Sequence, residues 1–203
     1  VLKLRVATNL LANRNQNNPR PMKIQLLSDL HLESDPGFVA HPIPGADLLV
    51  LAGDIGSYQQ RSRLTTDDFG LGRYAPRNGW PTPVVYVPGN HEYDNLDFDE
   101  THERLQTLCQ QLEIQWLERE TRVIDGVRLV GTTLWTDFDA LAAPGDTLTQ
   151  VLAKRGKAFR AADFYLEKAQ MRRHGAPFMA EQMREQGLAC QAWLEQALRT
   201  PFD

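Results

Sequence analysis

The sequence of 203 residues lacks long apolar runs and is poor in cysteine. No stretch approaches the ~18 consecutive apolar residues that a membrane-spanning helix needs, so we expect no membrane association. The two cysteines, Cys109 and Cys190, match neither a zinc-site spacing nor a disulfide framework. Unpaired thiols are typical of a reducing compartment, and they therefore predict a cytoplasmic protein.

Glycine-rich nucleotide loops and a basic surface are also missing. No G-x-G-x-x-G or Walker pattern occurs in the chain. After residue 21 there are 18 Lys and Arg against 26 Asp and Glu, whereas a duplex-DNA binder needs a basic face. We therefore expect no duplex nucleic acid partner, and a nuclease has less support because no basic aromatic groove is indicated. An excess of carboxylates suits a domain that binds a cation.

Residues 1–21 differ in composition from the remainder of the chain. They hold four basic and no acidic residues, are rich in Asn, and end in Pro19-Arg20-Pro21. The Asn residues interrupt any apolar targeting segment, so the pattern predicts an appended or disordered tail. Length and composition fit one further globular domain, over residues 22–203.

Three short apolar runs dominate the first half of this domain. They cover residues 22–28, 47–52 and 84–87, and they resemble the buried strands of a parallel sheet. Farther on, the pattern predicts a helix from Asp99 to about Leu112. It also predicts three later strands, over residues 114–118, 121–124 and 127–133.

Turn and helix signals complete the expected α/β organisation. Asp125-Gly126 predicts a hairpin turn between the last two strands. The last third of the chain is predicted to be helical, and Pro177 is expected to open its clearest helix. One apolar stripe of that helix is expected to join the core, through Phe178, Met179, Met183, Leu188, Trp193 and Leu194.

A polar cluster follows each of the first three strands. These clusters are Ser28-Asp29-Leu30-His31, Gly53-Asp54 and Gly89-Asn90-His91-Glu92. Loops after the carboxyl ends of neighbouring strands line one crevice in open α/β sheets, so the clusters should converge. A single strand-end Asp or His is usually a turn or surface residue, but three clusters together favour a functional site.

The residue types of these clusters suit a metal site. Asp29, His31, Asp54 and Asn90 offer carboxylate, imidazole and amide donors, a set suited to Mn²⁺, Fe or Zn²⁺. Two such ions ~3.5–4 Å apart would activate water and stabilise a phosphoryl displacement. His91 could donate a proton to the leaving oxygen, and Glu92 could hold the His91 ring in one tautomer.

Two other charged patterns are more simply explained by solvation. The acidic run from Asp94 to Glu100 lacks the glycine of a calcium loop and predicts a solvated helix start. Basic residues of the helical third could contact substrate phosphate, but a solvated helix face is the stronger expectation. These are Arg155, Lys157, Arg160, Arg172 and Arg173.

The three clusters resemble the first three motifs of the calcineurin-like metallophosphoesterases. SDLHLE (28–33), LAGDIG (51–56) and VPGNHEY (87–93) correspond to D-x-H, G-D and G-N-H-[ED], and GTTLWTDF (131–138) resembles a stretch of a small bacterial branch. The resemblance implies that Asp29 and His31 bind one metal ion and that Asp54 bridges two. It also implies that Asn90 binds the second ion and that His91 acts at the leaving group.

The same resemblance implies a fold, a reaction and a gap. The implied fold is a sandwich of two mixed sheets flanked by helices. The implied reaction is hydrolysis of small phosphomonoesters or phosphodiesters, nucleotide-like ones included. Two further histidine-bearing motifs of the family are missing, because His41, His102 and His174 fit neither.

This gap leads to the expectation of a C-terminally truncated domain that lacks its last strands. The alternative to an active enzyme is then a catalytically weak or inactive domain that only binds metal or a partner. Missing strands would also leave an apolar sheet edge open to self-association.

Overall fold

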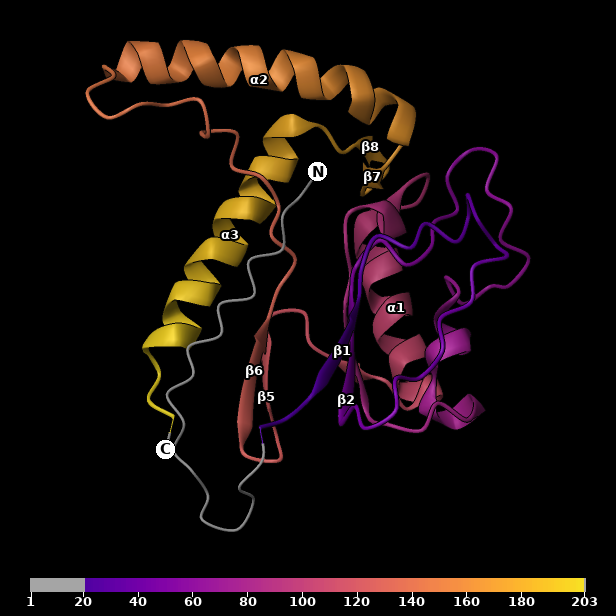
Figure 1. Ribbon diagram of the computed structural model, residues 1–203. Helices are drawn as coiled ribbons and strands as arrows, with labels where there is room; N and C mark the ends of the chain where they lie inside the picture. Colours follow the sequence, from indigo (N-terminus) through magenta and orange to yellow (C-terminus); the bar gives the residue numbers. More distant parts are fainter. Residues whose placement is uncertain (1–20, 203) are drawn as a thin grey trace.

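The computed structural model describes residues 21–202, and its core is a four-stranded parallel sheet (Figure 1). The strands are β1 (Ile24–Leu27), β2 (Leu48–Ala52), β3 (Val84–Val87) and β4 (Gln115–Trp116), paired in that order. The expected tail falls almost wholly outside the described residues and stays a prediction.

The two central strands alternate side chains between two buried faces. In β2, Leu49 and Leu51 join the larger core cluster, while Leu48 packs in a second, smaller cluster. In β3, Val84 belongs to the larger cluster and Val85 to the smaller one. Because successive strand residues point to opposite faces, the continuous apolar runs are explained by burial on both sides.

An antiparallel hairpin covers the face of the sheet that carries the smaller cluster. Its strands are β5 (Glu120–Ile124) and β6 (Val127–Gly131), and Ile124 and Leu129 pack against that cluster. Asp125 and Gly126 have φ of 48° and 78°, the positive values of a type I′ turn, so the predicted hairpin is confirmed. The expected mixed α/β class is confirmed, with a wholly parallel larger sheet in the described chain.

Three α-helices of residues 21–202 pack around or beyond these sheets. Helix α1 (Phe98–Leu112) packs beside the parallel sheet, α2 (Leu148–Ala169) crosses one end of the molecule, and α3 (Ala180–Arg199) runs beside the hairpin (Figure 1). Short 3-10 turns cover residues Leu71–Tyr74 (η1), Pro76–Asn78 (η2) and His91–Tyr93 (η3). Between α2 and α3 lies a two-residue pair of strands, β7 (Arg172–Arg173) and β8 (Ala176–Pro177).

Several element boundaries differ from those predicted. Asp97, not Asp99, caps α1, since its side chain accepts the Asp99 backbone N–H. Pro177 lies in β8, and the last helix begins three residues later. The strands predicted over 22–28, 114–118 and 127–133 are shorter than expected, because their ends leave the ladder to form loops.

The predicted core stripe of α3 is only partly correct. Phe178 and Met183 are buried, but Leu188 is 40% exposed. The adjacent Gly187 instead faces the core, where a Cβ would lie 2.8 Å from the Trp135 carbonyl oxygen. A close backbone approach therefore selects the buried face of this helix at the expense of the apolar pattern.

Both cysteines are free and buried, as predicted. Burial raises the pKa of the Cys109 thiol to about 12, so its reactive thiolate form is negligible near neutral pH. No helix within residues 21–202 has the length and apolar character to cross a membrane.

Strand β1 forms one edge of the parallel sheet. Its Ile24 and Leu26 side chains are 44% and 47% exposed. The sequence analysis expected an open apolar edge where C-terminal strands are missing, and self-association through a sheet edge stays a prediction.

The burial of His102 in α1 should make the free energy of unfolding depend on pH. Burial lowers its pKa, because its ring packs on Phe98 and Trp116 while Nδ1 lies 3.0 Å from the Tyr93 hydroxyl. The unfolded chain therefore binds a proton first as the pH falls below ~6.5, and the free energy of unfolding should decrease there. His102→Phe keeps an aromatic ring but removes the titrating group.

Urea unfolding of wild type and His102→Phe at pH 8 and pH 5.5 measures this effect. We expect wild type to lose more stability than the variant between the two values. Equal losses in both proteins would show that His102 does not contribute.

Candidate metal centre

The three polar clusters meet at the carboxyl ends of the parallel strands, as predicted. Strands β1, β2 and β3 are parallel neighbours, so the loops that follow them lie at the same end of the sheet. Backbone bonds of 3.0 Å continue the pairing beyond the strands, from Asp29 N–H to the Gly53 carbonyl and from His31 N–H to the Asp54 carbonyl. The first two loops are therefore fixed relative to each other.

Two glycines let the second and third loops touch. A Cβ on Gly53 would lie 2.6 Å from the Gly89 nitrogen, and one on Gly89 would lie 2.1 Å from Asp54 Oδ1. No side chain fits at either place, so the Gly-Asp and Gly-Asn sequences are explained by this contact. In return, the His91 N–H donates to Asp54 Oδ1 at 2.9 Å.

The backbone is strained at three candidate ligands. Asp29, His31 and Asp54 have φ of 55°, 47° and 53°, in the left-handed region that side chains other than glycine rarely adopt. Such strain persists only where surrounding structure enforces it, and it concentrates at functional sites.

Glu92 connects the second and third loops from beneath the site. It is fully buried, and its carboxylate accepts backbone N–H groups of Asp54, Ile55 and Gly89 at 3.1, 2.8 and 2.9 Å. Burial and the nearby Asp54 charge raise the pKa of Glu92 to about 7. The predicted contact of Glu92 with the His91 ring is wrong, because the carboxylate is committed to these amides.

Asp94 instead holds the His91 ring. His91 Nδ1 lies 2.6 Å from Asp94 Oδ2, and Asp94 is 2% exposed. This hydrogen bond raises the pKa of His91 to about 9, against the opposing effect of burial. The prediction that Asp94 belongs to a solvated helix start is therefore wrong.

His31 has a matching buried carboxylate. Its Nδ1 lies 3.0 Å from Glu33 Oε1, and Glu33 also accepts the Ser57 N–H and the Gln59 side-chain amide at 3.1 and 3.0 Å. An ionised carboxylate only accepts, so Nδ1 of each ring donates and Nε2 is left for another partner. A carboxylate behind an imidazole is typical of metal-binding histidines.

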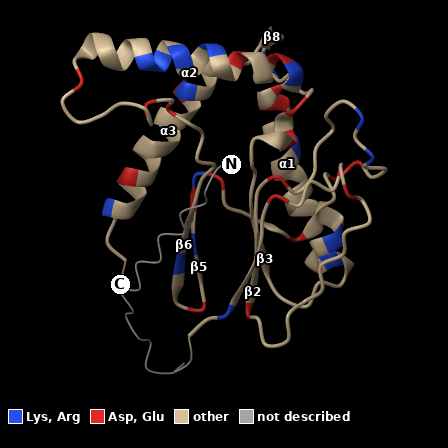
Figure 2. Cartoon of the chain, turned by 45° about the horizontal axis from the view of Figure 1, so that its top comes forward, with Lys and Arg blue, Asp and Glu red and all other residues tan. Residues whose placement is uncertain are grey.

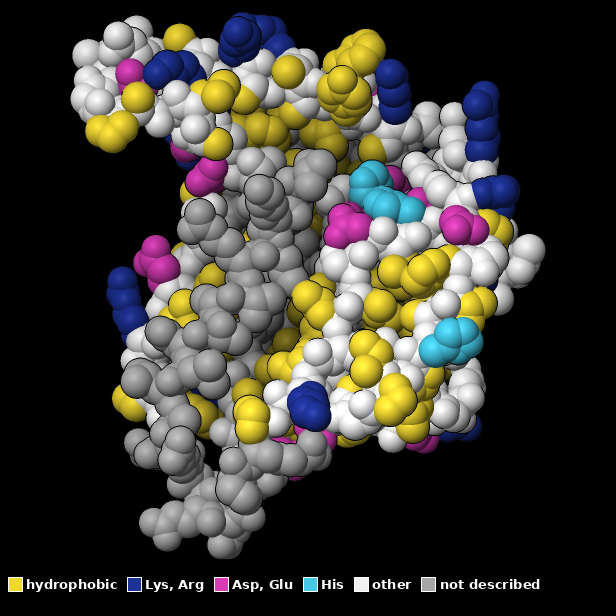
Figure 3. Space-filling view, viewed as in Figure 1, with side chains coloured by type: hydrophobic (Ala, Val, Ile, Leu, Met, Phe, Trp, Pro, Cys, Tyr) yellow, Lys and Arg dark blue, Asp and Glu magenta, His cyan; other side chains and the backbone are white. Residues whose placement is uncertain are grey.

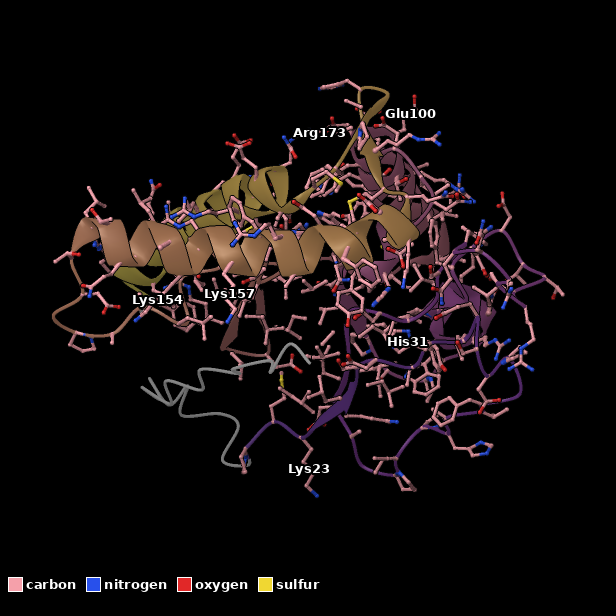
Figure 4. The ribbon with its side chains drawn as sticks, turned by 90° about the horizontal axis from the view of Figure 1, so that it is seen from above. Lys23, His31, Glu100, Lys154, Lys157 and Arg173 are labelled. Atoms are coloured by element: carbon pink, nitrogen blue, oxygen red, sulfur yellow. The ribbon has the colours of Figure 1, made fainter. Side chains whose placement is uncertain are left out.

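Three side chains, one from each loop, lie close enough together to hold a metal ion. Ligand atoms of His31, Asp54 and His91 all lie within 4.8 Å of one another. Figure 3 shows histidine and acidic side chains together on the face below α2. In the view from above, His31, Lys154 and Lys157 are labelled on the same side of α2 (Figure 4). Asp29 lies outside this group and is held by the Ser28 hydroxyl.

Asn90 is placed beside this group by the chain itself, since it directly precedes His91 at the start of the η3 turn. The remaining histidines lie elsewhere in the described chain. His102 packs in the core of α1, and His174 lies 3.4 Å from Asp99. His41 lies in the loop between β1 and β2. That none of the three supplies a family motif stays a prediction.

Basic residues lie on and after α2 (Figure 2), and some of them form ion pairs. Arg155 makes two bonds of 2.7 Å to Asp139, and Arg173 makes two of 3.0 Å to Asp99. These contacts account for both arginines without a substrate.

Sequence reasoning did not single out Glu33 or Asp94 as site residues. Each signal was local: a carboxylate two residues after His31, and one three residues after His91. In a 3-10 turn, side chains at i and i+3 eclipse, which brings Asp94 to the His91 ring.

A parallel sheet whose strand ends gather carboxylates and imidazoles defines an α/β protein with a candidate metal centre. Residues 22–197 match the model of the calcineurin-like phosphoesterase family, and the chain belongs to that family. The predicted resemblance is thereby confirmed.

A solved structure shows the same fold. The chain resembles phosphopantetheinyl hydrolase (PptH) from Mycobacterium tuberculosis, with a TM-score of 0.53 and 20% identity. The match covers 86% of this chain and 63% of that structure.

A curated relative matches a shorter segment. An uncharacterized protein of Acanthamoeba polyphaga mimivirus is 35% identical over 61 residues, which cover 27% of this chain and 22% of that protein. The chain thus spans less than two thirds of either protein.

Proposed function

We propose that this chain is a metal-dependent phosphoesterase that hydrolyses small phosphate esters at the His31, Asp54 and His91 group. The observation that carries the proposal is the convergence of three strand-end loops on this group, with both rings held by buried carboxylates. Membership of the calcineurin-like family supports phosphate esters as the substrate class. The proposed substrates are small phosphomonoesters or phosphodiesters, nucleotide-like ones included, and the experiment below distinguishes the two classes.

The donor set suits one divalent ion well. Asp29, His31 and Asp54 offer two carboxylates and one imidazole, which suits Mn²⁺, Fe or Zn²⁺. For a second ion, the predicted ligands among residues 21–202 are Asp54 and Asn90. We therefore propose a first ion at His31 and Asp54, which Asp29 would join by turning from the Ser28 hydroxyl, and a second, weaker ion held by Asp54 and Asn90.

Each side chain then has a chemical task. When bound, a divalent ion would polarise phosphoryl oxygens and activate water. The hydrogen bond to Asp94 raises the pKa of His91 to about 9 and so favours the protonated ring, which would donate a proton to the leaving oxygen. Asp94 orients that ring, while Glu92 keeps the second and third loops in contact.

Mn²⁺ titration of the 203-residue protein tests the proposal. Calorimetry on a sample shown to be monodisperse should give at least one ion per chain. Monodispersity matters because self-association through an open sheet edge is predicted. Hydrolysis of p-nitrophenyl phosphate and of bis(p-nitrophenyl) phosphate should rise with Mn²⁺ occupancy.

The outcomes separate the enzyme from the alternative. Mn²⁺ binding without turnover of either ester would favour a domain that only binds metal or a partner. Turnover that ignores added Mn²⁺ and survives chelation would contradict the metal-dependent proposal.

A further inference from the structure

We infer that Thr133 and Trp135 are positioning residues that fix both ends of the loop carrying Asn90 and His91. The inference rests on the proposed function, because that function gives the loop a metal ligand and a proton donor. It assigns a role to the GTTLWTDF segment, which supplies no metal ligand to the His31, Asp54 and His91 group.

Thr133 fixes the first end of the loop. It lies two residues beyond β6, and its hydroxyl Oγ1 donates to the Pro88 carbonyl oxygen at 2.6 Å. Both residues are buried, and Pro88 directly precedes Gly89 and Asn90. The bond joins the loop after the hairpin to the loop after β3, two segments of different sheets.

Glu118 holds Thr133 in place for this contact. It is 8% exposed, it accepts the Thr133 backbone N–H, and it accepts the Thr132 hydroxyl at 3.1 Å. Its Oε2 also lies 3.0 Å from Thr133 Oγ1. A hydroxyl has one proton to donate, and the Pro88 oxygen is the nearer acceptor. The buried carboxylate therefore sets the backbone, and the hydroxyl reaches the site loop.

Trp135 fixes the second end of the loop. Its ring lies 5.8 Å from the Tyr93 ring and 5.9 Å from the Phe98 ring, and Tyr93 stacks on Phe98 at 4.6 Å. Trp135 and Tyr93 are 5% and 1% exposed. Tyr93 ends the η3 turn that begins at His91, so Asn90 and His91 lie along the chain between two residues that the same segment contacts, Pro88 and Tyr93.

Thr133→Val tests the hydroxyl at nearly constant volume. The variant leaves the Pro88 carbonyl without its donor, so the loop should shift where it meets Gly53 and Asp54. Nuclear magnetic resonance of the metal-free protein should then show displaced Asn90 and His91 signals. Mn²⁺ binding should weaken about 10-fold or more, the range typical of residues behind metal ligands.

Two control variants separate positioning from general damage. Thr133→Ser keeps the hydroxyl and should restore the Asn90 and His91 signals and the Mn²⁺ affinity. Thr101→Val removes another buried threonine hydroxyl, in α1, and should leave both unchanged. On an active enzyme, Thr133→Val should lower kcat more than it raises KM.

The inference and the proposed function can fail separately. Unmoved Asn90 and His91 signals in Thr133→Val, or equal displacement in the Val and Ser variants, would overturn the inference even in an active enzyme. A wild-type protein without phosphoesterase activity would overturn the proposed function, while the metal-free spectra still decide the role of Thr133.

Discussion

Asp54→Asn should lower the Mn²⁺-dependent kcat/KM about 10³-fold, the upper range for losing one preorganised electrostatic contact. A carboxylate oxygen of Asp54 lies within 4.8 Å of ring nitrogens of both His31 and His91. Its carboxylate also accepts the His91 N–H, which an amide oxygen can still do. The loss therefore falls on the negative charge that a metal ion needs.

The fold should survive this substitution. Asn tolerates the positive φ of 53° at this position, and removing the charge relieves repulsion with the buried Glu92 carboxylate. Asp125→Asn is a matched control, because Asp125 also has positive φ but lies in the exposed β5–β6 turn. Steady-state kinetics and thermal unfolding of both variants measure the two effects. Full activity in Asp54→Asn would remove Asp54 from the metal centre.

The sheet and the meeting of the loops could be predicted because they follow from local patterns. Residues 84–87 form β3 as predicted, since a continuous apolar run and the following Pro88-Gly89 fix both ends. The order of the parallel strands then places every strand-end loop at one edge. Convergence of the clusters is therefore a consequence of topology.

The partners of the histidines could not be read in the same way. Glu92 and Asp94 are both carboxylates close to His91 in sequence, and only the turn geometry decides between them. The η3 turn brings Asp94 to the ring, while Glu92 turns inward to three backbone amides. Which carboxylate orients the ring depends on those amides, and two of them belong to the distant residues Asp54 and Ile55.

The contact between Thr133 and Pro88 is harder still to predict from the sequence. A hydroxyl after β6 reaches a carbonyl 45 residues earlier, and the bond exists only because the hairpin packs over the parallel sheet. The sequence marks the GTTLWTDF segment as unusual, but its role depends on how the two sheets are layered.

Glu92→Ala should destabilise the fold by roughly 3 kcal/mol or more, because it leaves three N–H groups without an acceptor at ~1–3 kcal/mol each. These are the N–H groups of Asp54, Ile55 and Gly89. For a domain of this size, each kcal/mol lowers Tm by about 2–4 °C, so a decrease of roughly 6–12 °C is expected.

Glu92→Gln separates the loss of the acceptor from the loss of side-chain volume. Its single amide oxygen can serve the Ile55 N–H or the pair of N–H groups that share Oε2, but not both, and its NH₂ faces the remaining donor. The variant should therefore be less stable than wild type and more stable than Glu92→Ala. Thermal and urea unfolding of the three proteins, with the exposed-site change Glu113→Ala as control, give this order. If Glu92→Ala unfolds within ~0.5 kcal/mol of wild type, as surface substitutions do, Glu92 does not hold the loops together, and its carboxylate becomes available for the chemistry of the site.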